Sequence, residues 1–364
     1  MKILFCISSL TGGGAETQLY YLSTELSKIG HEVHVFYIWD NSNIKKNWGS
    51  VNLHKSNAKS NYSPKIFIDF FKLINTYNFD IVQSWVVQMD IISGFFVSFF
   101  KFKWIIREPS SSKNYNSSFK NKLRVFLSQK ASVIVSNSIQ GKLYWESKNK
   151  PTIKRIILNG IPYEKIEDVI SNSKEFNFSF KDYILYVGRL VDDGTAKKNI
   201  SKLILAFNQV NKPKKKLKLL IVGDGKDLKK FQLIVQQLKI EESVFFLGHQ
   251  KSESVYQLMK NSMLFVSLSE FEGCPNTVLE ALYTCDRILL SNIDEHLSIF
   301  PNSIDNLFVD PNNVDEIVDK MIALIESPPK KNSYSELTKR YRTERMVSEY
   351  ASLYREFLIN NLEK

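Results

Sequence analysis

The sequence has few cysteines and no long uncharged apolar run. Its three cysteines, Cys6, Cys274 and Cys285, include no Cys-x-x-Cys pair, and none lies next to a histidine in the chain. This pattern predicts neither a disulfide framework nor a zinc site and indicates a reducing compartment. Crossing a bilayer takes about 18 uncharged apolar residues. The nearest approach, 91–106, is interrupted by lysines, so we expect no membrane-spanning helix.

Glycine and proline are also scarce, with 14 and 10 among 364 residues, while 43% of the chain is hydrophobic and 24% is charged. That balance excludes a collagen-like or disordered chain and is typical of a globular protein. At about 150 residues per domain, the length predicts two domains. The chain starts with Met1-Lys2 and runs directly into an apolar strand, without the features of a signal peptide. We therefore expect a cytoplasmic protein.

Positive charge gathers in the first half of the chain. Residues 1–170 hold 22 Lys and Arg against 12 Asp and Glu, whereas 171–364 hold 27 against 26, so the first half carries nearly all of the net charge of +11. It also contains three basic, Phe-rich helical patterns, 65–77, 90–100 and 119–130. Such faces bind anionic lipid surfaces, while packing of Phe beneath solvated lysines is the alternative. No stacking motif accompanies them, so we expect an anionic membrane as partner and no nucleic acid.

Short β-branched runs alternate with helical patterns along the whole chain, which is typical of parallel sheets built from βαβ units. A polar stretch, Glu164–Lys181, interrupts the alternation and is interpreted as a linker. We predict an α/β protein of two Rossmann-like domains, 1–165 and 178–340, with parallel sheets that face one another across a cleft. A charged helix, about 335–358, is expected near the end, with 345–364 packed back on the first domain. The strands are expected at 2–8, 32–38, 51–54, 80–84, 103–107, 132–135, 155–158, 183–187, 217–222, 244–247, 263–268, 287–291 and 307–309.

Glycines and basic residues follow the first strand of each expected domain. Gly12-Gly13-Gly14 opens the first helix, where glycines let backbone amides approach a phosphate. Thr17 replaces the third glycine of the dinucleotide fingerprint, which argues against a nicotinamide enzyme. In the second domain, Gly188-Arg189-Leu190 is followed by Lys197-Lys198-Asn199, and these cations suit a diphosphate. A tight turn and solvated charges are the alternatives.

The segment 269–282 carries the strongest chemical signal. It follows an apolar strand, and Pro275 suits the first turn of a helix, so 274–277 are expected to form a helix N-terminus that holds an anion. Glu272 precedes this helix and Glu280 lies within it. A carboxylate beside a diphosphate is unfavourable unless it accepts hydrogen bonds, and sugar hydroxyls supply them. Two solvated glutamates are the alternative.

Over nearly all of its length the chain resembles the retaining family 4 glycosyltransferases, which have the GT-B fold. Glu272 and Glu280 enclose seven residues, as in the family's Glu-x7-Glu motif. The other motifs in the family's order are Gly12-Gly13-Gly14, Asn137-Ser138, Leu158-Asn159-Gly160-Ile161, Gly188-Arg189-Leu190, Lys198-Asn199, Val222-Gly223-Asp224-Gly225 and Phe246-Leu247-Gly248. The resemblance implies a GT-B enzyme that takes a sugar from a nucleotide-sugar donor and retains its anomeric configuration.

The resemblance also implies roles for individual residues. Arg189 and Lys198 would bind the donor diphosphate, Glu280 the ribose hydroxyls and Glu272 the hydroxyls of the transferred sugar. Glu272, Arg189 and Lys198 are therefore the expected catalytic residues. The further donor-binding residues that the resemblance implies are Gly13, Gly14, Cys274, Pro275, Asn276 and His249.

The chain departs from the family's pattern in two places. Where many relatives have a histidine this chain has none, and Arg107 or Glu108 is expected to orient the acceptor instead. The loop 189–198 is longer than usual, which leaves open whether Lys197 or Lys198 reaches the diphosphate. No Asp-x-Asp motif occurs, so we expect neither a metal nor a cofactor. Side chains and a helix dipole would neutralise the leaving group.

These observations predict a hexosyl- or N-acetylhexosaminyl-transferase. It would move a sugar from a UDP- or GDP-sugar to a polyprenyl-diphosphate-linked glycan during O-antigen or capsule synthesis, at the cytosolic face of the inner membrane. Two alternatives stay open: a nonhydrolysing UDP-sugar epimerase and a catalytically silent GT-B scaffold that binds lipid. Glu272, Glu280 and Arg189 weigh against the scaffold.

Overall fold

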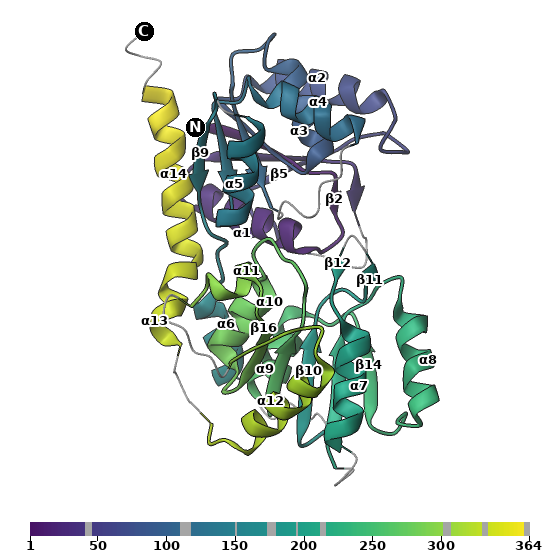
Figure 1. Cartoon of the computed structure of the whole chain (residues 1–364). Coiled ribbons are helices and arrows are strands. Elements are labelled where there is room, and N and C mark those ends of the chain that lie inside the picture. Colours follow the sequence, from purple (N-terminus) through teal and green to yellow (C-terminus); the bar gives the residue numbers. More distant parts are fainter. Residues whose placement is uncertain are drawn as a thin grey trace. The chain divides into compact units, whose positions relative to one another are not determined.

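The structure is a computed structural model that describes residues 1–40, 46–109, 118–149, 151–172, 180–193, 196–211, 216–300, 307–329 and 334–359. The chain divides into two compact units (Figure 1). Unit 1 comprises Met1–Gly160 and Tyr341–Lys364, and unit 2 comprises Ile161–Arg340.

Unit 1 contains a seven-stranded parallel sheet of order β5-β3-β1-β6-β7-β8-β9. Its strands are β1 (Lys2–Cys6), β3 (Glu32–Tyr37), β5 (Asn52–Lys55), β6 (Ile81–Trp85), β7 (Lys103–Glu108), β8 (Val133–Ser136) and β9 (Ile153–Ile156), and a short parallel pair adds β2 (Ser9–Leu10) and β4 (Trp39–Asp40). The helices are α1 (Gly14–Lys28), α2 (Lys65–Tyr77), α3 (Val87–Phe96), α4 (Phe119–Ser128), α5 (Ile139–Lys148) and α14 (Thr343–Ile359).

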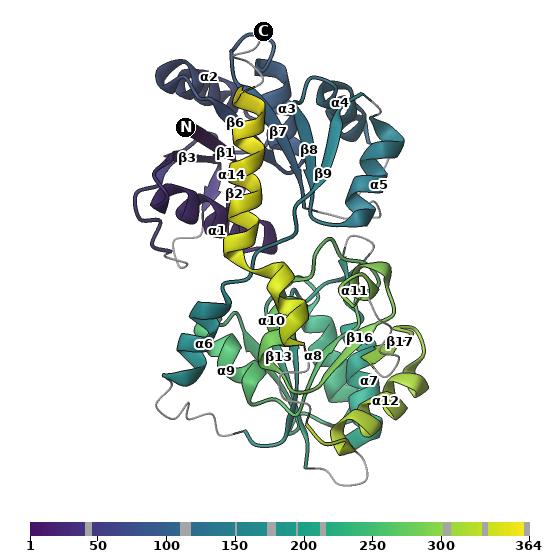
Figure 2. The ribbon, with the colours of Figure 1, turned by 90° about the vertical axis from the view of Figure 1, so that its left-hand side faces the viewer.

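The sheet of unit 1 is buried on both faces, because successive side chains of a strand point to opposite sides. Ile3 and Phe5 join the core that includes α1 and α14, while Leu4 and Cys6 join the core that includes α2 and α3. Figure 2 shows α14 lying along the sheet. Its fully buried Tyr354 donates a hydrogen bond of 2.6 Å to Gln83 Oε1 on β6.

Unit 2 repeats this plan with a six-stranded parallel sheet of order β14-β13-β10-β15-β16-β17. Its strands are β10 (Tyr183–Val187), β13 (Lys218–Val222), β14 (Val244–Gly248), β15 (Leu264–Ser267), β16 (Ile288–Ser291) and β17 (Phe308–Val309), with a small antiparallel pair, β11 (Asp192–Asp193) and β12 (Ala196–Lys197). The helices are α6 (Tyr163–Ser171), α7 (Ile200–Asn211), α8 (Leu228–Leu238), α9 (Ser252–Lys260), α10 (Asn276–Thr284), α11 (Asp294–Leu297), α12 (Val314–Glu326) and α13 (Ser335–Thr338), and a 3₁₀ turn follows at Lys339–Tyr341.

The predicted fold class, an α/β protein with two parallel sheets, is confirmed. Each expected strand is present within about two residues of its predicted bounds, the accuracy expected for strand ends. Gly30 closes α1 with a φ of +90°, a backbone conformation that favours glycine.

Two expectations about the connecting segments are wrong. The stretch Glu164–Lys181 is not simply a linker, because α6 occupies its first part; 173–179 lie outside the described residues. Tyr163 and Ile166, three positions apart, are buried, and the ring of Tyr163 packs against Tyr283 of α10. The polar residues between them concealed this apolar spacing.

The expected helix 335–358 is also interrupted, between α13 and α14. The break falls where the chain passes from unit 2 to unit 1. Tyr334 packs its ring against Phe300 of unit 2, whereas Met346 and Tyr350 enter the core of unit 1. Within the expected segment 345–364, the described residues belong to α14, and 360–364 lie outside the description. None of the helices that the structure describes is long and apolar enough to cross a bilayer.

Candidate functional site

The strand order of unit 2 reverses direction between β10 and β15. In open α/β sheets, ligands bind beyond the carboxyl ends of the strands at such a reversal. The turn with Arg189 follows β10, and the loop with Glu272 follows β15. The fold of unit 2 thus brings the two segments singled out in the sequence to the same edge of its sheet.

Arg189 is presented by a turn that packs backbone to backbone against the next loop. The Gly188 amide donates to the Val222 carbonyl at 3.0 Å, and the Leu190 amide to the Asp224 carbonyl at 2.9 Å. Gly223 has a φ of +131°, and a Cβ there would collide with the carbonyl of Gly188. The exposed Arg189 side chain has no hydrogen bond or ion pair with the described part of the chain. Its guanidinium is therefore available to an anion.

The structure distinguishes the two neighbouring lysines. Lys198 forms an ion pair with Glu272, and the two side chains are only 14% and 17% exposed. Lys197 pairs instead with Glu270 at 2.6 Å, and its side chain is 40% exposed. The structure thus brings Lys198, rather than Lys197, together with the first glutamate of the Glu-x7-Glu segment.

Glu272 is held from two sides through one oxygen. Its Oε1 accepts a hydrogen bond of 2.7 Å from Ser269 Oγ and forms the ion pair with Lys198. Burial alone would raise the pKa of Glu272, but Lys198 outweighs it and holds that pKa below its usual value. Among the described residues, Oε2 has no hydrogen-bond partner. One carboxylate oxygen is therefore free to accept from a hydroxyl.

Glu280, on the second turn of α10, has different surroundings. Its carboxyl group has no hydrogen bond or ion pair within the described ranges. Burial raises its pKa to about 8. A polar ligand that supplied hydroxyl donors would satisfy this group and favour its ionised form.

The loop between these glutamates ends at α10, for which Pro275 is the N-cap. The cap residue itself makes no side-chain hydrogen bond, and the first turn of a helix is a place where backbone amides bind anions. Cys274 and Asn276 flank Pro275 and are partly buried. His249 is exposed and follows the carboxyl end of β14, the outermost strand of the sheet. Donor contacts by these four residues stay predictions.

In unit 1, Gly13 is the N-cap of α1, and Gly14 is its first residue. The preceding Gly12 has a φ of +104°, so the turn itself requires glycine there. This turn follows β1, which neighbours β6 at the strand-order reversal of unit 1. A donor contact of Gly13 and Gly14 stays a prediction.

Arg107 and Glu108, the expected acceptor residues, are fully buried in unit 1. Arg107 donates to Asn159 Oδ1 at 2.7 Å, so it ties β7 to the segment that precedes unit 2. Glu108 Oε2 accepts from Arg124 and from Trp145 Nε1, each at 3.0 Å. Both side chains form hydrogen bonds with other groups of the protein, so their surroundings do not support a contact with the acceptor.

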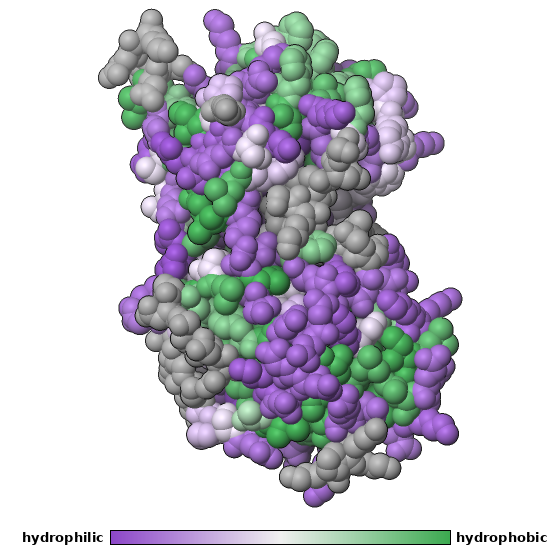
Figure 3. All heavy atoms as spheres, viewed as in Figure 1, coloured by the Kyte–Doolittle hydropathy of each residue, from purple (hydrophilic) through white to green (hydrophobic). Residues whose placement is uncertain are grey.

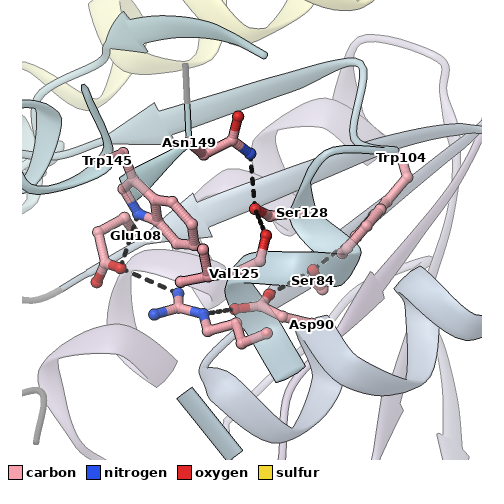
Figure 4. A network of polar contacts seen from close by, with 9 residues as sticks. Ser84, Asp90, Trp104, Glu108, Val125, Ser128, Trp145 and Asn149 are labelled. Atoms are coloured by element: carbon pink, nitrogen blue, oxygen red, sulfur yellow. Dashed lines mark hydrogen bonds and ion pairs between the residues drawn. The ribbon is translucent and has the colours of Figure 1, made fainter. Parts of the chain in front are cut away.

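Figure 4 shows the network around Glu108. The Arg124 side chain lies between two buried carboxylates, with its Nε 2.6 Å from Asp90 Oδ2. Ser84 Oγ donates to Asp90 Oδ1 at 2.6 Å and accepts from Trp104 Nε1 at 2.9 Å. Although Arg124 lowers it, burial raises the pKa of Asp90 to about 6. The network joins β6, β7, α3, α4 and α5 and is part of the interior of unit 1.

Sequence reasoning missed His296 on α11, which is fully buried. Its Nδ1 lies 3.0 Å from both the hydroxyl and the carbonyl oxygen of Ser291, at the end of β16. Glu272 and Lys198 act electrostatically on its ring. A lone histidine among polar residues gives no signal in the sequence; its place beside the strand-order reversal emerges only from the fold.

In the ranges that the structure describes, no group of three or more His, Cys, Asp or Glu side chains could hold a metal ion.

Comparison with known proteins agrees with this arrangement. Residues 169–341 match the family described as glycosyl transferases, group 1. A lipopolysaccharide 1,6-galactosyltransferase of Escherichia coli K12 is 26% identical over 78% of this chain and 77% of its own length. An N-acetylgalactosaminyltransferase of Campylobacter jejuni, whose name specifies a diphospho-undecaprenol-linked acceptor, is 28% identical over 62% of this chain and 60% of its own. An uncharacterized glycosyltransferase of Methanocaldococcus jannaschii is 29% identical, and the match spans 49% of this chain and only 45% of that protein.

Among solved structures, HepE of Anabaena in complex with UDP and glucose superposes with a TM-score of 0.81. It is 16% identical, and the match covers 98% of this chain and all of that one. At this identity the likeness concerns the fold, which is the GT-B fold that the sequence motifs predict.

Proposed function

Because residues 169–341 match the group 1 glycosyl transferases, we propose that the chain transfers a sugar from a UDP- or GDP-sugar to a polyprenyl-diphosphate-linked glycan. The transfer retains the anomeric configuration and extends a cell-surface polysaccharide such as an O-antigen or capsule. The transferred group is a hexosyl or N-acetylhexosaminyl residue. The enzyme acts as a peripheral protein on the cytosolic face of the inner membrane.

The observation that carries this proposal is the Lys198–Glu272 ion pair at the strand-order reversal. Arg189, whose side chain has no hydrogen-bond or ion-pair partner among the described residues, lies on the same sheet edge. A diphosphate needs cations, and a sugar needs acceptors for its hydroxyls. Arg189 and Lys198 supply the first, and Glu272 Oε2 supplies the second. A UDP- or GDP-sugar combines both demands in one molecule.

In the proposed reaction, the acceptor hydroxyl oxygen bonds to the anomeric carbon as the bond between the sugar and the diphosphate breaks. Negative charge then builds on the leaving diphosphate, and the hydroxyl proton passes to it. Arg189, Lys198 and the N-terminus of α10 stabilise that charge without a metal. Glu272 is ion-paired to Lys198 and orients the sugar through its hydroxyls, so it is not assigned as a covalent nucleophile.

The names of the relatives support the substrate classes. The C. jejuni enzyme is named for an undecaprenol-diphosphate acceptor, and the E. coli enzyme for lipopolysaccharide. HepE was solved with UDP and glucose. These names support a nucleotide-sugar donor and a lipid-linked acceptor for this chain.

The experiment that tests the proposal supplies labelled nucleotide-sugars together with a polyprenyl-diphosphate-linked glycan, with and without EDTA. We expect labelled lipid product in both conditions. Interconversion of the UDP-sugar without an acceptor would instead identify an epimerase, and neither transfer nor hydrolysis would identify a silent scaffold. Loss of transfer in EDTA with recovery on adding magnesium would overturn the metal-free step alone.

Unit 1 offers a surface for the proposed membrane contact. Four phenylalanines of α2 and α3 and the turn after α3 are exposed by 37% to 71%; they are Phe67, Phe71, Phe95 and Phe99. We call them the Phe surface. Their rings are linked by contacts such as Phe95–Phe99, with centroids 5.7 Å apart. Figure 3 shows hydrophobic groups among hydrophilic ones at this end of unit 1. Exposed lysines of the same region include Lys65, Lys72, Lys101, Lys120 and Lys122.

We therefore expect vesicles with anionic lipid to retain the protein and neutral vesicles to release it. Raising salt from about 0.1 M to 1 M shortens the Debye length from roughly 10 to 3 Å and should detach it. Replacing Phe95 and Phe99 together by serine should weaken retention in co-sedimentation, whereas Leu233→Ser, an exposed residue of α8 in unit 2, should not. Equal, salt-insensitive binding to neutral vesicles would contradict the electrostatic account.

A further inference from the structure

In the proposed function, the lysine that is ion-paired with Glu272 also binds the donor diphosphate. Within the described residues, Lys198 is its ion-pair partner. When Lys198 turns to a diphosphate, Glu272 loses the charge that compensates it. A largely buried carboxylate left without a counter-charge is strongly unfavourable. A diphosphate that draws Lys198 away therefore favours another positive charge beside Glu272.

The hydrogen bonds around His296 fix where its proton lies. Ser291 Oγ is 2.5 Å from the carbonyl oxygen of Ser269, so the Ser291 hydroxyl donates to that carbonyl. The same hydroxyl oxygen then accepts from His296 Nδ1, which also faces the Ser291 carbonyl at 3.0 Å. A carbonyl oxygen only accepts hydrogen bonds. Nδ1 is consequently protonated, and Nε2 carries the lone pair of the neutral ring.

His296 Nε2 is a buried acceptor for which the described residues provide no partner. Leaving such a group unsatisfied costs stability, and native structures do so rarely. The ring is also linked to the glutamate loop through Ser291 and Ser269, and the Ser269 hydroxyl holds Glu272. Figure 1 shows β16 and α11, the elements that carry this link. The unsatisfied nitrogen thus belongs to the framework of the site.

The charged groups that act on the ring are Glu272, from the loop after β15, and Lys198, from the segment before α7. On its own helix, Asp294 and Glu295 are the acidic neighbours. Burial and Lys198 lower the pKa of His296 to about 4, while Glu272 opposes them. Departure of Lys198 removes one of the lowering effects and leaves the attraction of Glu272. This departure therefore favours a proton on the ring.

From this geometry we infer that His296 is the positioning residue for Glu272 and takes up a proton when Lys198 engages the donor diphosphate. One proton from solvent binds Nε2, and the imidazolium replaces Lys198 as the counter-charge of Glu272. No other bond forms or breaks. The inference rests on the proposed function, because it needs an anion that draws Lys198 away.

The test measures proton uptake during binding of UDP or GDP to the full chain. Calorimetric titrations at pH 7.5 in buffers of different ionisation enthalpy give the number of protons taken up. His296→Asn keeps an amide donor near the position of Nδ1 and lacks Nε2. We expect the wild type to take up more protons than this variant, and the variant to bind several-fold more weakly. The nucleotide and Glu280 exchange the same protons in both proteins, so their contribution cancels when the variant is subtracted from the wild type.

His31→Asn, in unit 1, is the matched control and should behave as the wild type. Equal proton uptake by wild type and His296→Asn would overturn the inference while the proposed function stood. Absence of nucleotide binding to the wild type would instead overturn the proposed function. If His296→Asn fails to fold, the imidazole resonance of His296 in the wild type decides the question. It must titrate at higher pH with nucleotide than without, and an unchanged titration would contradict the inference.

Discussion

Replacing Arg189 with alanine is expected to lower turnover about 100-fold while the protein folds normally. The loss of one charge-assisted donor to a developing anion costs roughly 3 kcal/mol in the transition state. Folding should not suffer, because the exposed side chain has no hydrogen bond or ion pair with any described residue. The backbone of the turn, which does make contacts, is unchanged by the substitution.

Steady-state kinetics of sugar transfer measures this loss, and two variants interpret it. Arg189→Lys keeps the charge but loses the forked donor, so it should recover only part of the activity. Lys229→Ala removes an exposed cation on α8 and should leave turnover unchanged. Near-normal activity of Arg189→Ala would remove Arg189 from the mechanism.

Replacing Arg124 with methionine should destabilise unit 1 by about 3 to 5 kcal/mol, because it leaves two buried carboxylates without their shared cation. Arg124, Asp90 and Glu108 all have fully buried side chains. A typical domain is stable by only about 5 to 15 kcal/mol. The variant is therefore expected to lose a large part of the free energy of unfolding of unit 1.

Tryptophan fluorescence during urea denaturation isolates this effect, because all five tryptophans lie within residues 1–160. The matched control is Arg155→Met. The Arg155 side chain is 49% exposed and lies 3.8 Å from Glu356, and such a surface pair contributes about 0 to 1 kcal/mol. A similar small change in both variants would show that the buried network does not stabilise unit 1.

The decrease in the free energy of unfolding caused by Arg124→Met should depend on pH. The folded pKa of Asp90, about 6, lies above its ordinary value, so the folded state binds this proton more tightly than the unfolded state. Stability therefore falls as pH rises toward and through 6. Without Arg124, which lowers this pKa, the folded value rises further. The difference between Arg124→Met and wild type should thus narrow as the pH falls below 6.

The sequence predicts the sheets well because the strands of buried parallel sheets are continuous apolar runs, such as Tyr183–Val187. It misjudges segments whose apolar residues are few and widely spaced. Tyr163 and Ile166 bury one side of α6, yet the surrounding charges suggested a linker. The interrupted C-terminal helix depends on two separate cores, which local periodicity cannot distinguish.

For the site, spacing singled out Glu272 and Glu280 but did not predict their surroundings in the fold. The choice between Lys197 and Lys198 required the hairpin β11–β12, which directs them to Glu270 and Glu272 respectively. Arg107 or Glu108 was expected to orient the acceptor because these residues lie where many relatives have a histidine. The fold buries both, because the aromatic side chains and Arg124 around them close over that strand end.

The two glutamates offer the most direct test of the central claim, that unit 2 binds a nucleotide-sugar with Glu280 on the ribose and Glu272 on the transferred sugar. UDP and GDP contain the ribose but no transferred sugar. Calorimetric titration with them should show weaker binding to Glu280→Gln, since an amide accepts from one hydroxyl where a carboxylate accepts from two.

The same titration should show undiminished affinity in Glu272→Gln, whose defect appears in turnover instead. Because the pKa of Glu280 is raised to about 8, binding to the wild type should strengthen as the pH rises through 8, and Glu280→Gln should lack this rise. If Glu272→Gln loses nucleotide affinity while Glu280→Gln keeps it, the assigned roles are contradicted.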